Sequence, residues 1–137
     1  MSISTLPSME FTFSIDVKGS DTGKQFQGTF TYKRPDRRAK SDISRLAARL
    51  NEDLKNLEED AKFMHEVLAS LRFTLKESPD WWKSEDFGMK LYDDNVSIEI
   101  YKACLKFENE WTDKVWGNQD KAKEELKEAL KTKEDLK

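Results

Sequence analysis

The sequence predicts an α+β fold, in which a small antiparallel sheet of two or three strands packs against a long helix and a second helix. Three observations support this fold class. Residues 10–33 alternate apolar and polar side chains on both sides of a glycine-containing turn, as in a β-hairpin. Residues 42–70 instead carry apolar side chains in alternating steps of three and four, which is a helical spacing. Residues 94–116 show a similar helical pattern.

The hairpin is predicted to consist of strands at about 10–17 and 26–33, with one apolar face formed by Phe11, Phe13, Ile15, Val17, Phe26, Phe30 and Tyr32. Gly28 replaces a side chain in this row, which indicates a bulge or the close approach of another element. Alternation resumes at about 71–76 and predicts a third strand. Because a two-stranded hairpin is only marginally stable alone, another element must cover its apolar face.

The helix at about 42–70 is predicted to begin after Ser41, which would serve as its N-cap. Its apolar residues form a heptad stripe of Ile43, Ala47, Leu50, Leu54, Leu57, Ala61, Met64, Leu68 and Leu71. A continuous helix of this length would run about 42 Å. A compact domain of this size is only roughly 36 Å across. The helix therefore either breaks near residues 58–60 or protrudes and needs a partner, and both alternatives stay open.

The second helix, at about 94–116, has an apolar face of Val96, Ile100, Cys104, Phe107, Trp111 and Val115. Asp93 or Asp94 is expected to cap its start with a carboxylate, and Gly117 is expected to end it. Residues 118–137 hold six Lys and six acidic residues among few apolar ones. We therefore expect a domain over residues 1–117, followed by a charged helical or flexible tail over 118–137.

The composition of the chain excludes several classes of function. The chain has 137 residues with 24 basic and 27 acidic side chains, for a net charge of −3, which argues against a dedicated nucleic-acid-binding domain. One Cys and one His can form neither an internal disulfide nor a zinc site. The sequence contains no apolar run of membrane-spanning length, and its start lacks the pattern of a signal peptide. We expect a cytosolic protein without metal or cofactor.

No catalytic constellation is recognisable. His65 lies beside the heptad stripe without a second His or a Cys nearby, and Cys104 is interpreted as a small apolar residue of the second helix. The segment Gly19 to Lys24 lacks phosphate-loop spacing and connects two strands, so it is interpreted as a turn. Asp93 and Asp94 are consecutive and do not share a helix face, which favours capping over metal binding. We therefore do not expect an enzyme.

Two adjacent tryptophans, Trp81 and Trp82, follow Pro79 in a polar segment expected to be a loop. Both rings cannot easily enter one core, and exposed Trp is typical of interface hot spots. Either one ring is available to a partner, or both fold back as a lid over the sheet. The candidate partner contacts are Trp81, Trp82, Phe87, Leu54, Leu57 and Met64.

A basic run offers an alternative site. Lys33, Arg34, Arg37, Arg38 and Lys40 follow the aromatic residues of the second strand, and such a combination can bind nucleic acid by stacking and charge. The acidic balance of the whole chain instead favours a solvated connector.

Two segments of the chain, FSIDVKGSDTGKQFQGTFTYKRP and ESPDWWKSEDFGMKLYDDNVSIEIYKACLKFENEW, resemble tail assembly chaperones of long-tailed bacteriophages. The resemblance covers about residues 10–117. Its elements are a strand, glycine turn and strand ending in Lys33-Arg34, then Pro79-Asp80-Trp81-Trp82, then the helix start Leu91-Tyr92-Asp93-Asp94-Asn95-Val96 with Tyr101.

The resemblance implies a small non-enzymatic protein of the host cell cytoplasm that acts during tail morphogenesis. Such chaperones bind and solubilise the tape-measure protein, help to recruit tail-tube subunits and are generally absent from the mature virion. Some are made in short and frameshift-extended forms. The heptad stripe would also permit self-association. Two alternatives stay open: a structural component of the virion tail or connector, and a small nucleic-acid-binding regulator that rests on residues 33–40.

Overall fold

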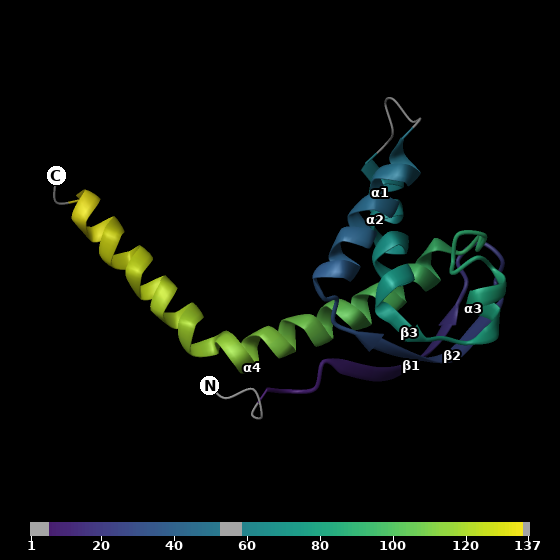
Figure 1. The fold of residues 1–137 in the computed structure, drawn as a ribbon, viewed down its shortest axis with the longest axis horizontal. Coiled ribbons are helices and arrows are strands. Elements are labelled where there is room, and N and C mark those ends of the chain that lie inside the picture. The colour runs from purple at the N-terminus through teal and green to yellow at the C-terminus, as the bar shows by residue number, and fades with distance from the viewer. Residues whose placement is uncertain (1–5, 53–58, 136–137) are drawn as a thin grey trace. The chain divides into compact units, whose positions relative to one another are not determined.

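The computed structural model describes residues 6–52 and 59–135, with side chains described as far as residue 116. In chain order the elements are β1 (Glu10–Lys18), β2 (Gln25–Lys33), α1 (Arg37–Asn51), α2 (Glu59–Thr74), β3 (Leu75–Glu77), α3 (Asp80–Ser84) and α4 (Asp94–Asp135), as Figure 1 shows. One compact unit spans residues 8–105, and a second unit includes residues 106–135. The α+β fold with a small antiparallel sheet is therefore confirmed.

The sheet has the strand order β1-β2-β3 with antiparallel neighbours. β1 and β2 pair without interruption from Glu10↔Lys33 to Lys18↔Gln25, which confirms the hairpin. The third strand exists but is shorter than the predicted 71–76, because α2 continues to Thr74. The hydroxyl of Thr74 donates to the carbonyl oxygen of Ser70 at 2.8 Å, and Phe73 lies exposed on the helix. The alternation that predicted the strand thus arises from two faces of a helix end.

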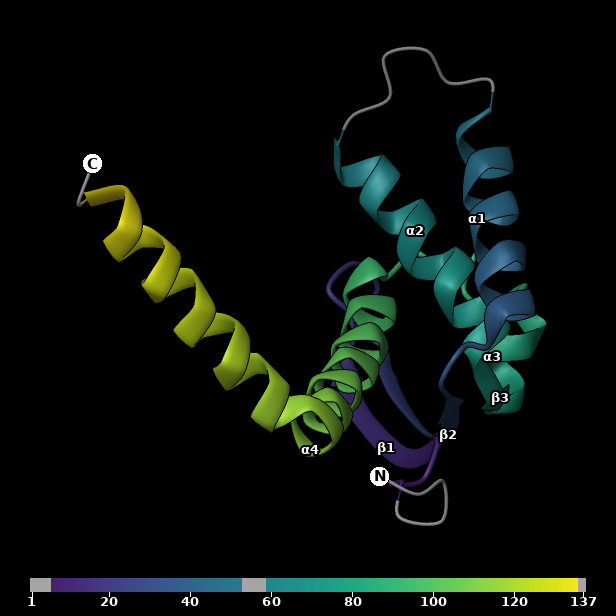
Figure 2. The same cartoon turned by 60° about the vertical axis from the view of Figure 1, so that its left-hand side comes forward.

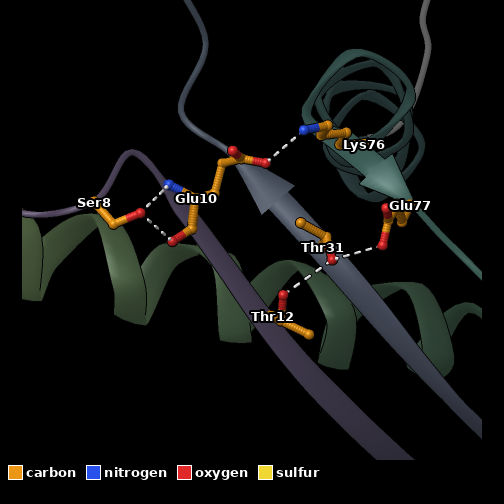
Figure 3. Close-up of polar contacts among 6 residues, drawn as sticks. All are labelled: Ser8, Glu10, Thr12, Thr31, Lys76 and Glu77. Atoms are coloured by element: carbon orange, nitrogen blue, oxygen red, sulfur yellow. Dashed lines mark hydrogen bonds and ion pairs between the residues drawn. The ribbon is translucent and has the colours of Figure 1, made fainter.

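Polar side chains cross the sheet on the face opposite the aromatic row (Figure 3). The hydroxyls of Thr12 and Thr31 lie 3.0 Å apart, and Thr31 in turn donates to Glu77 at 3.3 Å. The Nζ of Lys76 lies 3.0 Å from Oε1 of Glu10, so the carboxylate of β1 reaches β3. These contacts connect all three strands.

The stretch predicted as a helix over 42–70 is interrupted, which is one of the two alternatives that the sequence left open, because the structure forms two helices there. α1 ends at Asn51 and α2 begins at Glu59, and the two lie side by side (Figures 1 and 2). Leu50 and Leu68 line the same small cavity, and Asn51 hydrogen-bonds His65 at 2.7 Å. Of the described stripe residues, Ile43, Ala47 and Leu50 are half-buried on α1. Leu68 and Leu71 are buried on α2. Leu54 and Leu57 lie outside the described residues.

The start of α1 also differs from the prediction. Asp36, not Ser41, is the N-cap, and its carboxylate accepts from the backbone N–H of Ala39 at 2.8 Å. Ser41 lies inside the helix, where its hydroxyl donates to the carbonyl oxygen of Arg37 at 3.2 Å. Asp36 directly follows Pro35, and the backbone of Asp36 is extended, as is typical of an N-cap residue.

Gly117 does not end the last helix, contrary to the prediction for 94–116, because α4 continues to Asp135 over 42 residues. A Gly inside a helix costs about 1 kcal/mol relative to Ala, which the Lys-, Glu-, Ala- and Leu-rich sequence after it can offset. The part of residues 118–137 that the structure describes is thus helical. Among the described helices, none combines the length and apolar character needed to cross a bilayer.

The core of the first unit joins one strand and three helices. Its largest fully buried apolar side chains are Phe30 of β2, Val67 and Leu71 of α2, Trp82 of α3, and Val96 and Ile100 of α4. Figures 1 and 2 show the first part of α4 running beside β1 and β2. The second helix predicted by the sequence therefore contributes to the cover that the hairpin needs.

Candidate partner-binding site

The two tryptophans lie on α3, a short helix where the sequence predicted a loop. Successive helical residues point about 100° apart, so adjacent side chains separate. Trp82 is 0% exposed and meets the edge of Phe30, with ring centroids 6.0 Å apart. Trp81 stays half-buried, and its ring stands at 87° to that of Trp82. One indole is thus part of the core, while the other lines the surface.

Trp81 is held against β2 rather than projecting freely. Its Nε1–H donates to the carbonyl oxygen of Gln27 at 2.9 Å, and its ring centroid lies 5.2 Å from that of Phe26. Gly28 makes this approach possible, because a Cβ there would lie 2.3 Å from Cγ of Pro79. The predicted close approach at Gly28 is confirmed.

A cavity of about 410 Å³ opens beside Trp81. We call it the Trp81 cavity; its lining residues are Thr22, Lys24, Gln25, Phe26, Gln27, Trp81, Glu85, Lys90, Leu91, Tyr92 and Asp93. Tyr92 is 79% exposed, the highest value among the large apolar side chains described as exposed. The wall therefore combines aromatic surface with charges of both signs, a composition suited to binding an amphipathic peptide.

The turn between β1 and β2 wraps around the residue that precedes α4. Oδ1 of Asp93 accepts from the backbone N–H groups of Asp21 at 2.6 Å and Thr22 at 2.9 Å, and Oδ2 accepts from the Thr22 hydroxyl at 2.6 Å. A Cβ on Gly19 would lie 2.4 Å from Cγ of Asp93, so only glycine fits there. These bonds fix one wall of the Trp81 cavity.

The sequence correctly placed the helix start but not the role of this carboxylate. The backbone N–H of Val96 bonds the Asp93 carbonyl at 3.0 Å, whereas the Asp93 side chain binds the turn. The Thr22 hydroxyl bond lowers the pKa of Asp93 most, the backbone N–H groups and Lys24 lower it further, and burial opposes them. At Asp94, burial and then the charges of Asp21 and Asp93 raise the pKa.

Phe87 lies apart from the Trp81 cavity. Its backbone is left-handed, with φ of 52°, as is that of Asp86, and the Arg72 guanidinium carbon lies 3.9 Å from its ring centroid. Phe87 lines a second cavity of about 170 Å³ with Leu46, Leu50, Leu68, Arg72, Asp86 and Met89. Met64 is half-buried on α2. The structure therefore does not bring Phe87 and Trp81 into one site.

The basic run is divided between the end of β2 and the first turns of α1. Lys33, Arg37, Arg38 and Lys40 are exposed, and Arg34 is half-buried. Arg38 pairs with Asp42 at 3.5 Å. Phe30 and Tyr32 are buried in the core, so neither ring can stack on a base beside these charges.

Cys104 and His65 are the cysteine and the histidine of the sequence. Cys104 is buried, and His65 is half-buried on α2. Within the described ranges, His, Cys, Asp and Glu side chains form no group of three or more that could hold a metal ion. No family model, curated protein or solved structure matches this chain. The choice of the Trp81 cavity as the candidate site therefore rests on the geometry of the cavity alone.

Proposed function

We propose that this chain is a non-enzymatic tail assembly chaperone. It binds and solubilises the tape-measure protein of a long-tailed bacteriophage and helps to recruit tail-tube subunits. The observation that carries the proposal is the convergence of its three recognisable segments on one cavity. The glycine turn and β2 supply Thr22 to Gln27, the tryptophan motif supplies Trp81, and the helix-start motif supplies Leu91 to Asp93.

The chemistry of the Trp81 cavity fits an amphipathic helical client. Phe26, Trp81 and Leu91 offer apolar surface, and each buried Å² of such surface contributes about 25 cal/mol. Lys24, Lys90 and Glu85 lie in the same wall and can pair with charges that flank an apolar anchor of the client. An apolar client side chain would therefore insert beside Trp81, while charged neighbours fix its orientation.

The test is co-purification of the chain with fragments of the tape-measure protein encoded in the same genome. Trp81→Ala removes the cavity wall and should abolish co-purification. Phe73→Ala is the matched control, because Phe73 is a 40% exposed aromatic residue that does not line the cavity. Equal recovery of the wild type and both variants would contradict the proposal.

A second measurement separates the chaperone from a virion component. The proposal places the protein in the host cytoplasm and leaves it out of the finished particle. Quantitative mass spectrometry of purified phage should therefore detect at most traces of this chain. Stoichiometric amounts in mature particles would support the structural alternative instead.

A further inference from the structure

We infer that the outer edge of β1 pairs with β1 of a second copy of this chain, antiparallel and with Ser14 on the two-fold axis. β1 is an edge strand of the described sheet, nine residues long, without Pro and without a register shift against β2. A long regular edge presents backbone N–H and C=O groups that form a template for another strand.

The backbone groups that face outward follow from two hydrogen bonds. The N–H of Arg34 donates to the carbonyl oxygen of Met9 at 2.9 Å. The N–H of Gly19 donates to the carbonyl oxygen of Lys24 at 2.7 Å. Odd-numbered residues of β1 therefore direct their backbone groups toward β2. Because these directions alternate along an antiparallel strand, the N–H and C=O of Thr12, Ser14 and Asp16 point away from the sheet.

Side chains close this edge at both ends, four residues either side of Ser14. The Ser8 hydroxyl both donates to the carbonyl and accepts from the N–H of Glu10, each at 3.1 Å (Figure 3). At the other end, Nδ2 of Asn95 donates to the carbonyl of Lys18 at 2.9 Å. Thr12, Ser14 and Asp16 lie between these closures and are exposed, and in the described part of the chain their outward backbone groups have no partner.

The residues of β1 complement themselves about Ser14. In the antiparallel pair, Glu10 faces Lys18 of the second copy, and Thr12 faces Asp16. On the other face, Phe11 lies opposite Val17, and Phe13 opposite Ile15. Opposite charges and apolar pairs directly across a ladder stabilise it, whereas like charges oppose it.

Neighbouring registers are worse, which makes this one specific. Centring the pair on Asp16 would place two carboxylates directly opposite each other. Centring it on Thr12 would require the backbone groups of Glu10, which Ser8 already occupies. A shift by one residue would bring inward-facing backbone groups opposite outward ones. The second copy is therefore the occupant that the residues of this edge fit.

The first test is the molar mass in solution, measured by sedimentation equilibrium over a wide range of protein concentrations. The wild type should reach twice its chain mass of 16.0 kDa. Ser14→Lys brings two ammonium groups together across the two-fold axis and should raise the dimer Kd by about tenfold or more. Thr29→Lys is the matched control, because Thr29 is the register partner of Ser14 on the inner strand and should leave the dimer unchanged.

The second test locates the interface by amide hydrogen exchange. In the wild-type dimer, the amides of Thr12, Ser14 and Asp16 should be protected, and dilution or Ser14→Lys should remove this protection. The amides of Phe13 and Ile15, which face β2, should stay protected in both proteins and so report that the sheet remains folded. A monomer at every concentration, a dimer unaffected by Ser14→Lys, or a dimer without this protection would each overturn the inference.

None of the residues that line the Trp81 cavity belongs to β1. Failure of the pairing would therefore leave the proposed chaperone function standing, and the reverse also holds.

Discussion

The Thr22 hydroxyl donates a 2.6 Å hydrogen bond to the carboxylate of Asp93, a residue 71 positions later in the chain. With the backbone bonds from Asp21 and Thr22, this contact joins the β-hairpin turn to the start of α4. Both segments contribute walls to the Trp81 cavity. The bond therefore connects the stability of the hairpin with the shape of the candidate site.

Asp93→Asn should lower the thermal unfolding midpoint at neutral pH by several degrees, because the buried carboxylate loses its charge against three donors. The folded-state pKa of Asp93 lies below its ordinary value of 3.8. Its stabilisation is thus present above that value and is lost as the pH falls through the lowered pKa. The difference between wild type and Asp93→Asn should consequently shrink as the pH falls below 3.8 and through the lowered pKa.

Asp94→Asn is the matched control with the opposite sign. The folded-state pKa of Asp94 is raised, so its ionisation opposes folding as the pH rises. This variant should leave the unfolding midpoint at neutral pH unchanged or raise it. A loss equal to that of Asp93→Asn would show that the acidic pair acts through general charge rather than through the turn.

Gly28→Ala should destabilise the fold by about 1–3 kcal/mol, because the added Cβ overlaps Cγ of Pro79. The chain would have to move α3 away from β2, which would lengthen the bond from Trp81 to Gln27. Urea unfolding followed by circular dichroism measures the loss of free energy. Gly23→Ala provides a comparison at an open position, where the cost arises from the positive φ of 73° rather than from contact with α3.

Trp82→Ala should cost about 3–5 kcal/mol, since the indole is fully buried beside Phe30 and Gly88. Tyr92→Ala should change stability by less than about 0.5 kcal/mol, because this ring is mostly exposed. Unfolding midpoints of the two variants test this assignment of core and surface. Similar losses for both would mean that Tyr92 is also needed for folding.

The wild-type chain should not bind nucleic acid at low salt in a fluorescence anisotropy titration. Its net charge is −3, and the aromatic rings nearest the basic run are buried. Salt-dependent binding that Arg37→Ala and Arg38→Ala weaken would instead support the regulator alternative.

The hairpin could be predicted from sequence because its period of two appears in contiguous residues. The heptad stripe was recognisable because its steps of three and four also recur along one stretch of the sequence. That pattern shows which face of a helix is apolar, but it does not show whether the helix is continuous. Two helices that pack side by side show the same spacing of Leu50 and Leu68 as one straight helix. The prediction that Gly117 ends the last helix was wrong for a different reason. The helix propensity of the residues on both sides outweighs the cost of a single glycine, so α4 continues through it.

The candidate site was predictable only in part. The sequence pointed to Trp81 and Trp82, yet which ring is buried depends on the rotation of α3 above β2. Phe26 and Tyr92 join the site through long-range packing, which periodicity does not report. Gly19 and Gly28 carried the available signal, because each marks a place where a distant residue approaches the backbone.

The most direct test of the Trp81 cavity as a client site is a binding isotherm with a labelled fragment of the tape-measure protein. Tyr92→Ala removes an exposed ring of the cavity without disturbing the core, so it should raise the Kd by about tenfold or more. Phe73→Ala should bind like the wild type. Unchanged affinity of Tyr92→Ala and Trp81→Ala, with both variants folded, would contradict the proposed function.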